Sequence, residues 1–168
     1  LMSASSKPRA PRRQVVSTDD RVRVVVRVRP SLHLTNKKPA AFPFDTSKSQ
    51  CDGDLFDAVL GPDATQDLAF KQVVPVVETW LNGYNATIFA YGQTGSGKSH
   101  TMLGPNGGKE ELTGVIPQVV SFAPKRLDQE KRDRLAAGGT NVIWNARLQA
   151  SYVELYNEQL RDLIRNDD

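Results

Sequence analysis

The stretch that decides the fold of this chain reads Gly92-Gln93-Thr94-Gly95-Ser96-Gly97-Lys98-Ser99. It matches the phosphate-binding pattern G-x-x-x-x-G-K-S/T, with Gly92 and Gly97 as the defining glycines. Glycine adopts backbone angles that other residues avoid, so successive N–H groups can point inward at an anion. A helix that begins directly after the loop adds its positive end. The pattern therefore predicts a loop that binds phosphate groups.

Two residues at the end of the loop carry the predicted chemistry. We expect the Lys98 ammonium to reach the β- and γ-phosphates of a nucleotide and the Ser99 hydroxyl to bind Mg²⁺. Both are candidate catalytic residues, because Lys98 and the metal ion would offset charge on a transferred phosphoryl group. The alternative is a glycine-rich turn with an exposed lysine. The flanks disfavour it, since residues 87–90 indicate a buried strand of a parallel sheet and a helix is expected from Lys98 past Met102.

The sequence before the loop indicates further strands. Residues 21–28 alternate arginine and valine and predict a strand that Pro30 ends. Turn-forming residues dominate residues 31–54, where we expect loops and small edge strands. Residues 55–60 predict a short strand or turn.

Residues 63–82 carry apolar side chains at helical spacing and predict a helix. Asp63 is the expected N-cap, and Asn82 with Gly83 is the expected stop. Pro75 should kink this helix or interrupt its hydrogen bonds. Helices between strands are typical of an α/β layer architecture.

The C-terminal part shows the same mixture. Residues 115–122 predict a helix that Pro124 should break, and residues 129–137 predict a second one. Residues 142–152 alternate apolar and polar side chains and predict a long, half-exposed strand. Residues 160–164 indicate a short helical turn.

The composition is ordinary for a soluble globular domain, with 168 residues, 39% hydrophobic and 24% charged. Cys51 is the only cysteine, which excludes an intrachain disulfide and fits a reducing compartment. No apolar stretch approaches the ~20 residues that cross a bilayer. The N-terminus also lacks the apolar region of a signal peptide.

A basic segment begins the chain and contributes to its net charge of +3. Residues 1–20 hold Lys7, Arg9, Arg12 and Arg13 among proline, alanine and serine. We expect a solvated, disordered arm. The alternative is an electrostatic contact with an acidic partner surface, either nucleic acid or an acidic filament.

Four collinear blocks of the sequence resemble the kinesin motor domain family. They are Arg27-Val28-Arg29-Pro30, Phe56-Asp57 with Thr65-Gln66, residues 84–102, and residues 151–158 with Arg161-Asp162-Leu163-Ile164. The resemblance covers about residues 20–168. It implies a P-loop NTPase fold of the kinesin type, a central mixed β-sheet flanked by helices, truncated before the switch regions. Residues 1–20 would be a basic arm and residues 21–168 a partial motor domain.

The resemblance also implies a nucleotide pocket for ATP and Mg²⁺. Its members would be Gly92, Gln93, Thr94, Gly95, Ser96, Gly97, Lys98, Ser99, His100, Arg27, Arg29 and Pro30. Arg27, Arg29 and Pro30 would border the adenine, with His100 near the base from the other side. Without the family, Arg27 and Arg29 read as solvated strand residues, Pro30 as a strand terminator and His100 as structural.

The resemblance implies an ATP-driven microtubule motor of the cytoplasm and cytoskeleton, with tubulin as partner and no DNA, RNA or membrane partner. Neither of the family's switch segments occurs, the Asn-x-x-Ser-Ser-Arg-Ser-His type or Asp-Leu-Ala-Gly-Ser-Glu. We therefore expect this chain to bind ATP with little or no hydrolysis of its own. The alternative is a non-catalytic or degenerate motor-head module that binds nucleotide or tubulin without turnover. A GTPase-like switch is disfavoured because the guanine signature Asn-Lys-x-Asp is absent.

Overall fold

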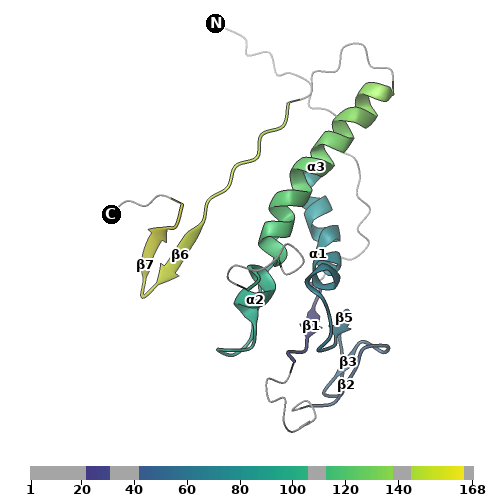
Figure 1. Cartoon of the computed structure of the whole chain (residues 1–168), viewed down its shortest axis with the longest axis vertical. Coiled ribbons are helices and arrows are strands. Elements are labelled where there is room, and N and C mark those ends of the chain that lie inside the picture. The colour runs from purple at the N-terminus through teal and green to yellow at the C-terminus, as the bar shows by residue number, and fades with distance from the viewer. Residues whose placement is uncertain (1–21, 31–41, 106–112, 138–144, 165–168) are drawn as a thin grey trace, which may run out of the picture. The chain divides into compact units, whose positions relative to one another are not determined.

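A computed structural model of the chain describes residues 22–30, 42–105, 113–137 and 145–164. The chain divides into two compact units, residues 1–126 and residues 127–168. The predicted N-terminal arm lies outside the described residues. Figure 1 shows the elements with the labels used below.

The first unit contains a parallel pair of strands, β1 (Val25–Arg27) and β5 (Ala58–Leu60), in which Val26 lies opposite Val59. These strands confirm the predictions for residues 21–28 and 55–60, although β1 is shorter than expected. Val28 follows β1, and its N–H donates to the carbonyl of Leu60 at 2.8 Å. Val28 and Val59 are buried together with Cys51, so the small core of this unit lies beside the parallel pair.

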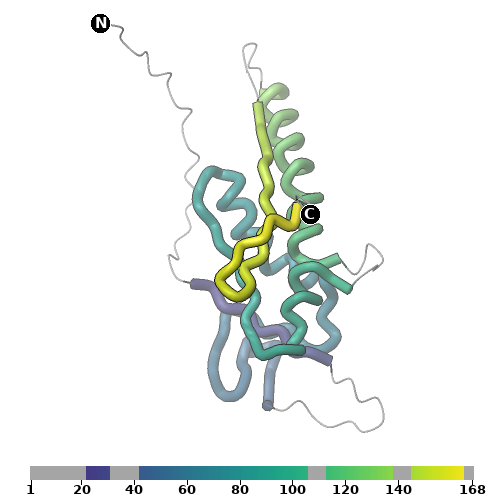
Figure 2. Tube along the Cα trace, turned by 90° about the vertical axis from the view of Figure 1, so that its left-hand side faces the viewer, coloured from purple at the N-terminus to yellow at the C-terminus, as the bar shows by residue number. Residues whose placement is uncertain are grey.

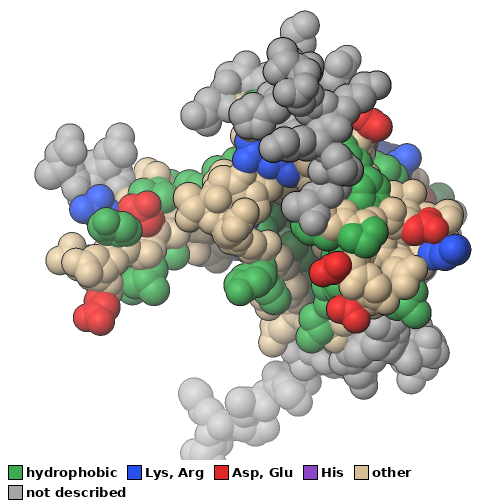
Figure 3. Space-filling view, turned by 90° about the horizontal axis from the view of Figure 1, so that it is seen from below, with side chains coloured by type: hydrophobic (Ala, Val, Ile, Leu, Met, Phe, Trp, Pro, Cys, Tyr) green, Lys and Arg blue, Asp and Glu red, His purple; other side chains and the backbone are tan. Residues whose placement is uncertain are grey.

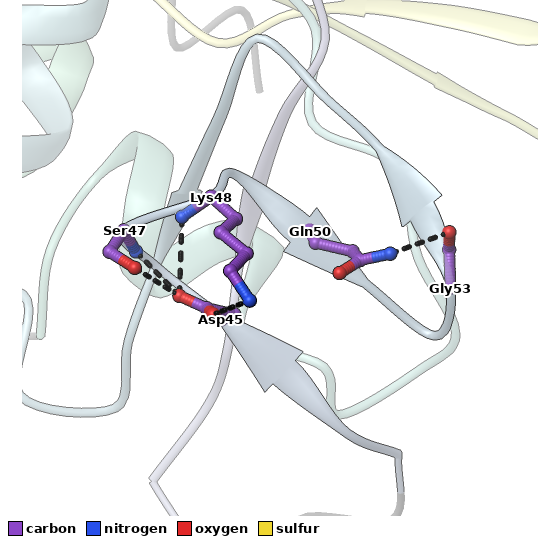
Figure 4. A network of polar contacts seen from close by, with 5 residues as sticks. All are labelled: Asp45, Ser47, Lys48, Gln50 and Gly53. Carbon is purple, nitrogen blue, oxygen red and sulfur yellow. Dashed lines mark hydrogen bonds and ion pairs between the residues drawn. The ribbon is translucent and has the colours of Figure 1, made fainter.

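Three two-residue strands form an antiparallel sheet next in the chain: β2 (Phe44–Asp45), β3 (Gln50–Cys51) and β4 (Asp54–Leu55). They confirm the small edge strands expected there. Figure 4 shows the turn between β2 and β3, where the Asp45 carboxylate accepts hydrogen bonds from Ser47 Oγ at 2.6 Å and from Lys48 N at 3.2 Å. The Ser47 hydroxyl is the main reason that the pKa of Asp45 is lowered, and Lys48 adds to the effect.

Helix α1 (Gln66–Leu81) occupies the predicted position, but its N-cap is Thr65 rather than Asp63. Thr65 is extended, and its hydroxyl accepts from the N–H of Leu68 at 3.2 Å, which satisfies a donor of the first turn. Asn82 caps the other end, as expected. The helix runs on through Pro75, which is exposed. Only one intrahelical donor is lost there, so the element remains continuous.

The region around the phosphate loop differs from the prediction on both sides. Residues 87–90 form no strand, and Phe89 and Tyr91 are 74% and 94% exposed. A buried parallel strand needs a hydrogen-bonded neighbour, and residues 87–90 pair with none of the strands that the structure describes. Helix α2 (Lys98–Met102) begins where expected but ends at Met102, followed by Gly104 at a φ of +91°.

One helix, α3 (Val115–Ala136), replaces the two helices predicted on either side of Pro124. The expected break is wrong because Pro124 and Val120 are both exposed, so water can bind the carbonyl that loses its intrahelical partner. The N-terminal half of α3 lies beside α1 (Figure 1), and the rings of Phe70 and Phe122 meet edge-on at 5.8 Å. Arg126 Nε also donates to the Glu78 carboxylate at 2.9 Å. Among the described residues, no helix is both long and apolar enough to cross a bilayer.

The second unit contains an antiparallel hairpin of β6 (Val153–Tyr156) and β7 (Gln159–Asp162). The helical turn predicted for residues 160–164 is therefore wrong. The strand predicted for residues 142–152 is also wrong over residues 145–152, which are exposed and irregular; residues 142–144 lie outside the described residues. Hydrophobic side chains lie at the surface of this hairpin (Figure 3).

Candidate phosphate-binding site

The loop of residues 92–99 has a backbone that depends on glycine. Gly92, Gly95 and Gly97 have φ values of +151°, +79° and +103°. The N–H of Ser96 donates to the carbonyl of Gln93 at 3.1 Å and closes a turn inside the loop. A Cβ at Gly92 would lie 2.6 Å from Ser96 Oγ. The glycine pattern read from the sequence therefore has a steric and conformational basis.

The Lys98 ammonium folds back into the loop. Its Nζ donates to the carbonyl oxygens of Gly92 at 2.9 Å and of Gln93 at 3.0 Å. Ser99 follows in the first turn of α2 and is exposed. A positive side chain, the start of a helix and an accessible hydroxyl thus converge on one loop, which suits a phosphate group.

The donor set also fits the way Mg²⁺ binds together with a nucleotide. In the part of the chain that the structure describes, no three His, Cys, Asp or Glu residues gather as a metal site. Mg²⁺ usually keeps several waters and is held by one or two protein ligands plus substrate phosphates. The Ser99 hydroxyl is the protein ligand that this arrangement offers.

Arg27 at the end of β1 is held by three hydrogen bonds. Its Nη1 donates to Gln66 Oε1 at 2.7 Å and to Thr101 Oγ1 at 3.1 Å, and its Nη2 donates to the carbonyl of Ala64 at 3.0 Å. Burial lowers the pKa of the Arg27 guanidinium. Arg27 therefore joins β1 to the start of α1 and to α2, and it is not the solvated strand residue that the sequence alone suggested.

Arg29 reaches the loop itself. Its Nη1 donates to the carbonyl of Gly95, so β1 and the segment after it contact both the loop and the helix behind it. Figure 2 shows the purple β1 segment passing close to the loop and α2. Pro30 is exposed next to Arg29, and His100 is exposed on α2. Of the predicted residues outside the loop, Arg29 therefore contacts the loop itself, whereas Arg27 contacts α2 and His100 lies on α2.

Sequence reasoning missed Gln66 as a site residue. It is 3% exposed and is the one buried polar residue within the described ranges. Its Nε2 donates to the carbonyl of His100 at 2.6 Å, while its Oε1 accepts from Arg27. Gln66 belongs to the Thr65-Gln66 block, where it reads as a helix start. The sequence feature that could have identified Gln66 is a polar residue in the first turn of a helix whose other buried positions are apolar.

Comparisons with known proteins agree with this geometry. A family model described as the kinesin motor domain matches residues 11–168. The kinesin-like protein KIF15 of Rattus norvegicus is 36% identical over 172 residues, which cover 90% of this chain and 12% of that protein.

Two solved structures are also similar. One is the Drosophila kinesin Kin10/NOD in complex with divalent manganese and ADP, with a TM-score of 0.61, 28% identity and coverage of 86% of this chain and 48% of that one. The other is NOD docked with bovine tubulin into a map of nucleotide-free NOD on the microtubule, with a TM-score of 0.62, 26% identity and the same two coverages. The chain thus spans about half the length of the structures it matches.

Proposed function

Since the chain belongs to the kinesin motor domain family, we propose that it is the nucleotide-binding part of a kinesin-like microtubule motor and that residues 92–99 bind ATP with Mg²⁺. The observation that carries the proposal is the loop itself, in which three glycines have positive φ and the Lys98 ammonium binds the carbonyls of Gly92 and Gln93 at the start of α2. The Drosophila relative bound to ADP and manganese supports the same ligand class.

The residues of the loop have separate roles in this proposal. Lys98 exchanges its bonds to the Gly92 and Gln93 carbonyls for bonds to phosphate oxygens. Ser99 supplies a hydroxyl ligand to Mg²⁺, and the loop N–H groups surround the phosphates. ATP with Mg²⁺, when bound, supplies the phosphoryl group and the charge that polarises it.

The adenine side of the pocket is proposed to lie between β1 and α2. Arg27, Arg29 and Pro30 border the base from one side and His100 from the other. The hydrogen bonds of Arg27 use the edge of its guanidinium, and a guanidinium stacks on an aromatic ring through its planar face. Arg29 reaches the same region through its contact with Gly95.

We propose that microtubules are the partner of the whole protein and that ATP hydrolysis there is coupled to movement along them. The docked NOD–tubulin assembly supports this partner. We also propose that the protein is located in the cytoplasm, on the microtubule cytoskeleton. Residues 21–168 would be the partial motor domain and residues 1–20 a basic arm outside it.

The test is a titration of the chain with a fluorescent ATP analogue, with and without Mg²⁺. Lys98→Ala should weaken binding at least about tenfold, because a charge-assisted contact to phosphate is lost. Lys71→Ala is the matched control, since Lys71 is an exposed lysine on α1. Equal binding by Lys98→Ala and the unmodified chain would contradict the proposal.

A measurement of phosphate release with and without microtubules distinguishes a chain that hydrolyses ATP from a module that only binds it. Binding without turnover would favour the non-catalytic module. Robust microtubule-stimulated turnover that Lys98→Ala abolishes would show that this chain hydrolyses ATP by itself, against our expectation.

A further inference from the structure

We propose that Gln66 is a positioning residue for nucleotide binding, which holds helix α2 in place so that Lys98 and Ser99 stand ready at the loop. This inference rests on the proposed nucleotide site at residues 92–99. Gln66 lies outside residues 92–99, and its buried side chain contacts the pocket residues Arg27 and His100.

The amide of Gln66 has one allowed orientation. Its Oε1 lies 2.7 Å from the Arg27 guanidinium, which only donates, and its Nε2 lies 2.6 Å from the carbonyl of His100, which only accepts. Exchanging the two ends would place donor against donor and acceptor against acceptor. The same Nε2 is 3.4 Å from Nδ1 of the His100 ring, so it also faces the side chain. Gln66 therefore links β1 and α2 through a single defined geometry.

Helix α2 needs such external support. It has five residues, and isolated helices below ~12–15 residues are marginal in water. Two side-chain hydrogen bonds tie α2 to other elements, one from Gln66 Nε2 to the His100 carbonyl and one from Arg27 Nη1 to Thr101 Oγ1. Lys98 and Ser99 directly precede His100 on the same turn, so a displacement of His100 also displaces both of them.

The helix that carries Gln66 is long and packed. Gln66 is the first residue of α1, a helix of 16 residues capped by the Thr65 hydroxyl. Ala69 and Val77 of this helix are buried. The orientation of α2 is thus fixed relative to α1, which is a long, packed helix. Without this reference, binding of nucleotide would first have to order α2, and that ordering would reduce affinity.

Two substitutions at Gln66 separate positioning from folding. Gln66→Met keeps the approximate shape and removes both hydrogen bonds. Gln66→Glu keeps the acceptor for Arg27 but sets a carboxylate oxygen against the carbonyl of His100. Gln72→Met is the matched control, because Gln72 is also a glutamine of α1 that accepts from an arginine, Arg23, at 3.2 Å.

The experiment measures the dissociation constants of a fluorescent ATP analogue and of inorganic tripolyphosphate on the full chain. All measurements are made well below the thermal unfolding midpoint of every variant, so that each is folded. Gln66→Met should weaken both ligands about tenfold, as expected when one to two hydrogen bonds that order a site are lost. Gln66→Glu should weaken both by a similar factor, because its carboxylate repels the carbonyl of His100. Gln72→Met should bind both ligands normally.

The inference is overturned if folded Gln66→Met and Gln66→Glu bind both ligands like the unmodified chain, even when their midpoints fall. If Gln66→Met does not fold, Gln66→Glu decides. A failure of the unmodified chain to bind either ligand would overturn the proposed function together with this inference. Normal binding by the unmodified chain with unaffected Gln66 variants would overturn the inference alone.

Discussion

Gly114 lies against the C-terminal end of α2, and its α-carbon leaves no room for a side chain. A Cβ would lie 2.5 Å from the carbonyl carbon of Met102 and 2.6 Å from the backbone of Leu103 and Gly104. The Gly114 N–H also donates to the Leu103 carbonyl at 3.2 Å, which joins the start of α3 to the end of α2. Backbone atoms cannot turn away as a flexible side chain does.

Gly114→Ala is therefore expected to lower the free energy of unfolding by about 1–3 kcal/mol, the usual cost of overpacking. Urea unfolding followed by circular dichroism measures this change. Gly61→Ala is the control, because a Cβ at Gly61 would lie 3.5 Å from Thr46 Cγ2, an ordinary contact. Equal stability of the two variants would show that the close approach at Gly114 does not exist in solution.

The ionisation of the buried Cys51 thiol can be tested by its dependence on pH. Burial raises the pKa of the Cys51 thiol, and the carboxylates of Asp52 and Asp54 raise it further. The unfolded chain thus loses this proton at a lower pH than the folded chain does. The contribution of the thiol to the free energy of unfolding is therefore present below the pKa of the unfolded chain, and it is lost as the pH rises through the pKa of the folded chain. Alkylation with iodoacetamide should follow a pH curve displaced to higher pH in the folded chain than in urea. Coincident curves would contradict this expectation.

Individual site residues differed in how far the sequence could identify them. Lys98 and Ser99 were found because a fixed spacing of glycine, lysine and serine has one well-understood use. Gln66 was not found, because its role depends on Arg27 and His100, which are 39 and 34 residues away. No local pattern encodes such a meeting of three elements.

At the scale of elements, Pro124 tests whether α3 is one helix. Proline in a helix interior removes one hydrogen bond and costs up to ~3 kcal/mol relative to alanine. In a continuous helix, Pro124→Ala restores the bond to the Val120 carbonyl, so thermal stability and ellipticity at 222 nm should both increase. Pro117→Ala should change little, because Pro117 lies in the first turn, where the N–H has no intrahelical partner. An equal response of both variants would indicate a break at Pro124.

The hairpin turn is a second element that can be tested. Asn157 and Glu158 have φ values of +47° and +64°, the signature of a type I′ turn, and only Asn157 suits such angles. Glu158→Gly should stabilise the β6–β7 hairpin by about 0.5–1 kcal/mol, since glycine adopts a positive φ without steric cost. Cross-strand nuclear Overhauser effects between Tyr156 and Gln159 would report it. Glu158→Ala is the control, and it should produce no gain.

The elements that were predicted wrongly share a physical cause. Residues 87–90 and 145–152 have strand-like sequences, but a strand forms only when a neighbour supplies hydrogen bonds. Local patterns contain no information on which neighbour is available. In contrast, α1 was located correctly because helix bonds are internal to the segment. Its N-cap was off by two residues, because Asp63 and Thr65 both have side chains that can cap.

For the whole molecule, the sequence supported an α/β P-loop fold, and the kinesin family match agrees with it. The division into two compact units was not predicted. The first unit buries Val59, Ala69 and Val77, whereas every described residue of β6 and β7 is exposed. Burial is a property of the assembled elements, so an alternating sequence such as residues 142–152 cannot reveal it.

This contrast predicts unequal protection against amide hydrogen exchange. A two-stranded hairpin is marginally stable by itself, so the amides of β6 and β7 should open with a free energy near zero. The central amides of α1 lie in a packed helix and should open only with several kcal/mol, which slows their exchange by a factor on the order of 10² or more. Mass spectrometry of peptides from the two regions measures the ratio, and the urea-unfolded chain supplies the reference rates. Equal protection of β6–β7 and α1 would mean that the hairpin is covered in solution, because exposed ladder bonds cannot resist exchange as well as buried helical ones do.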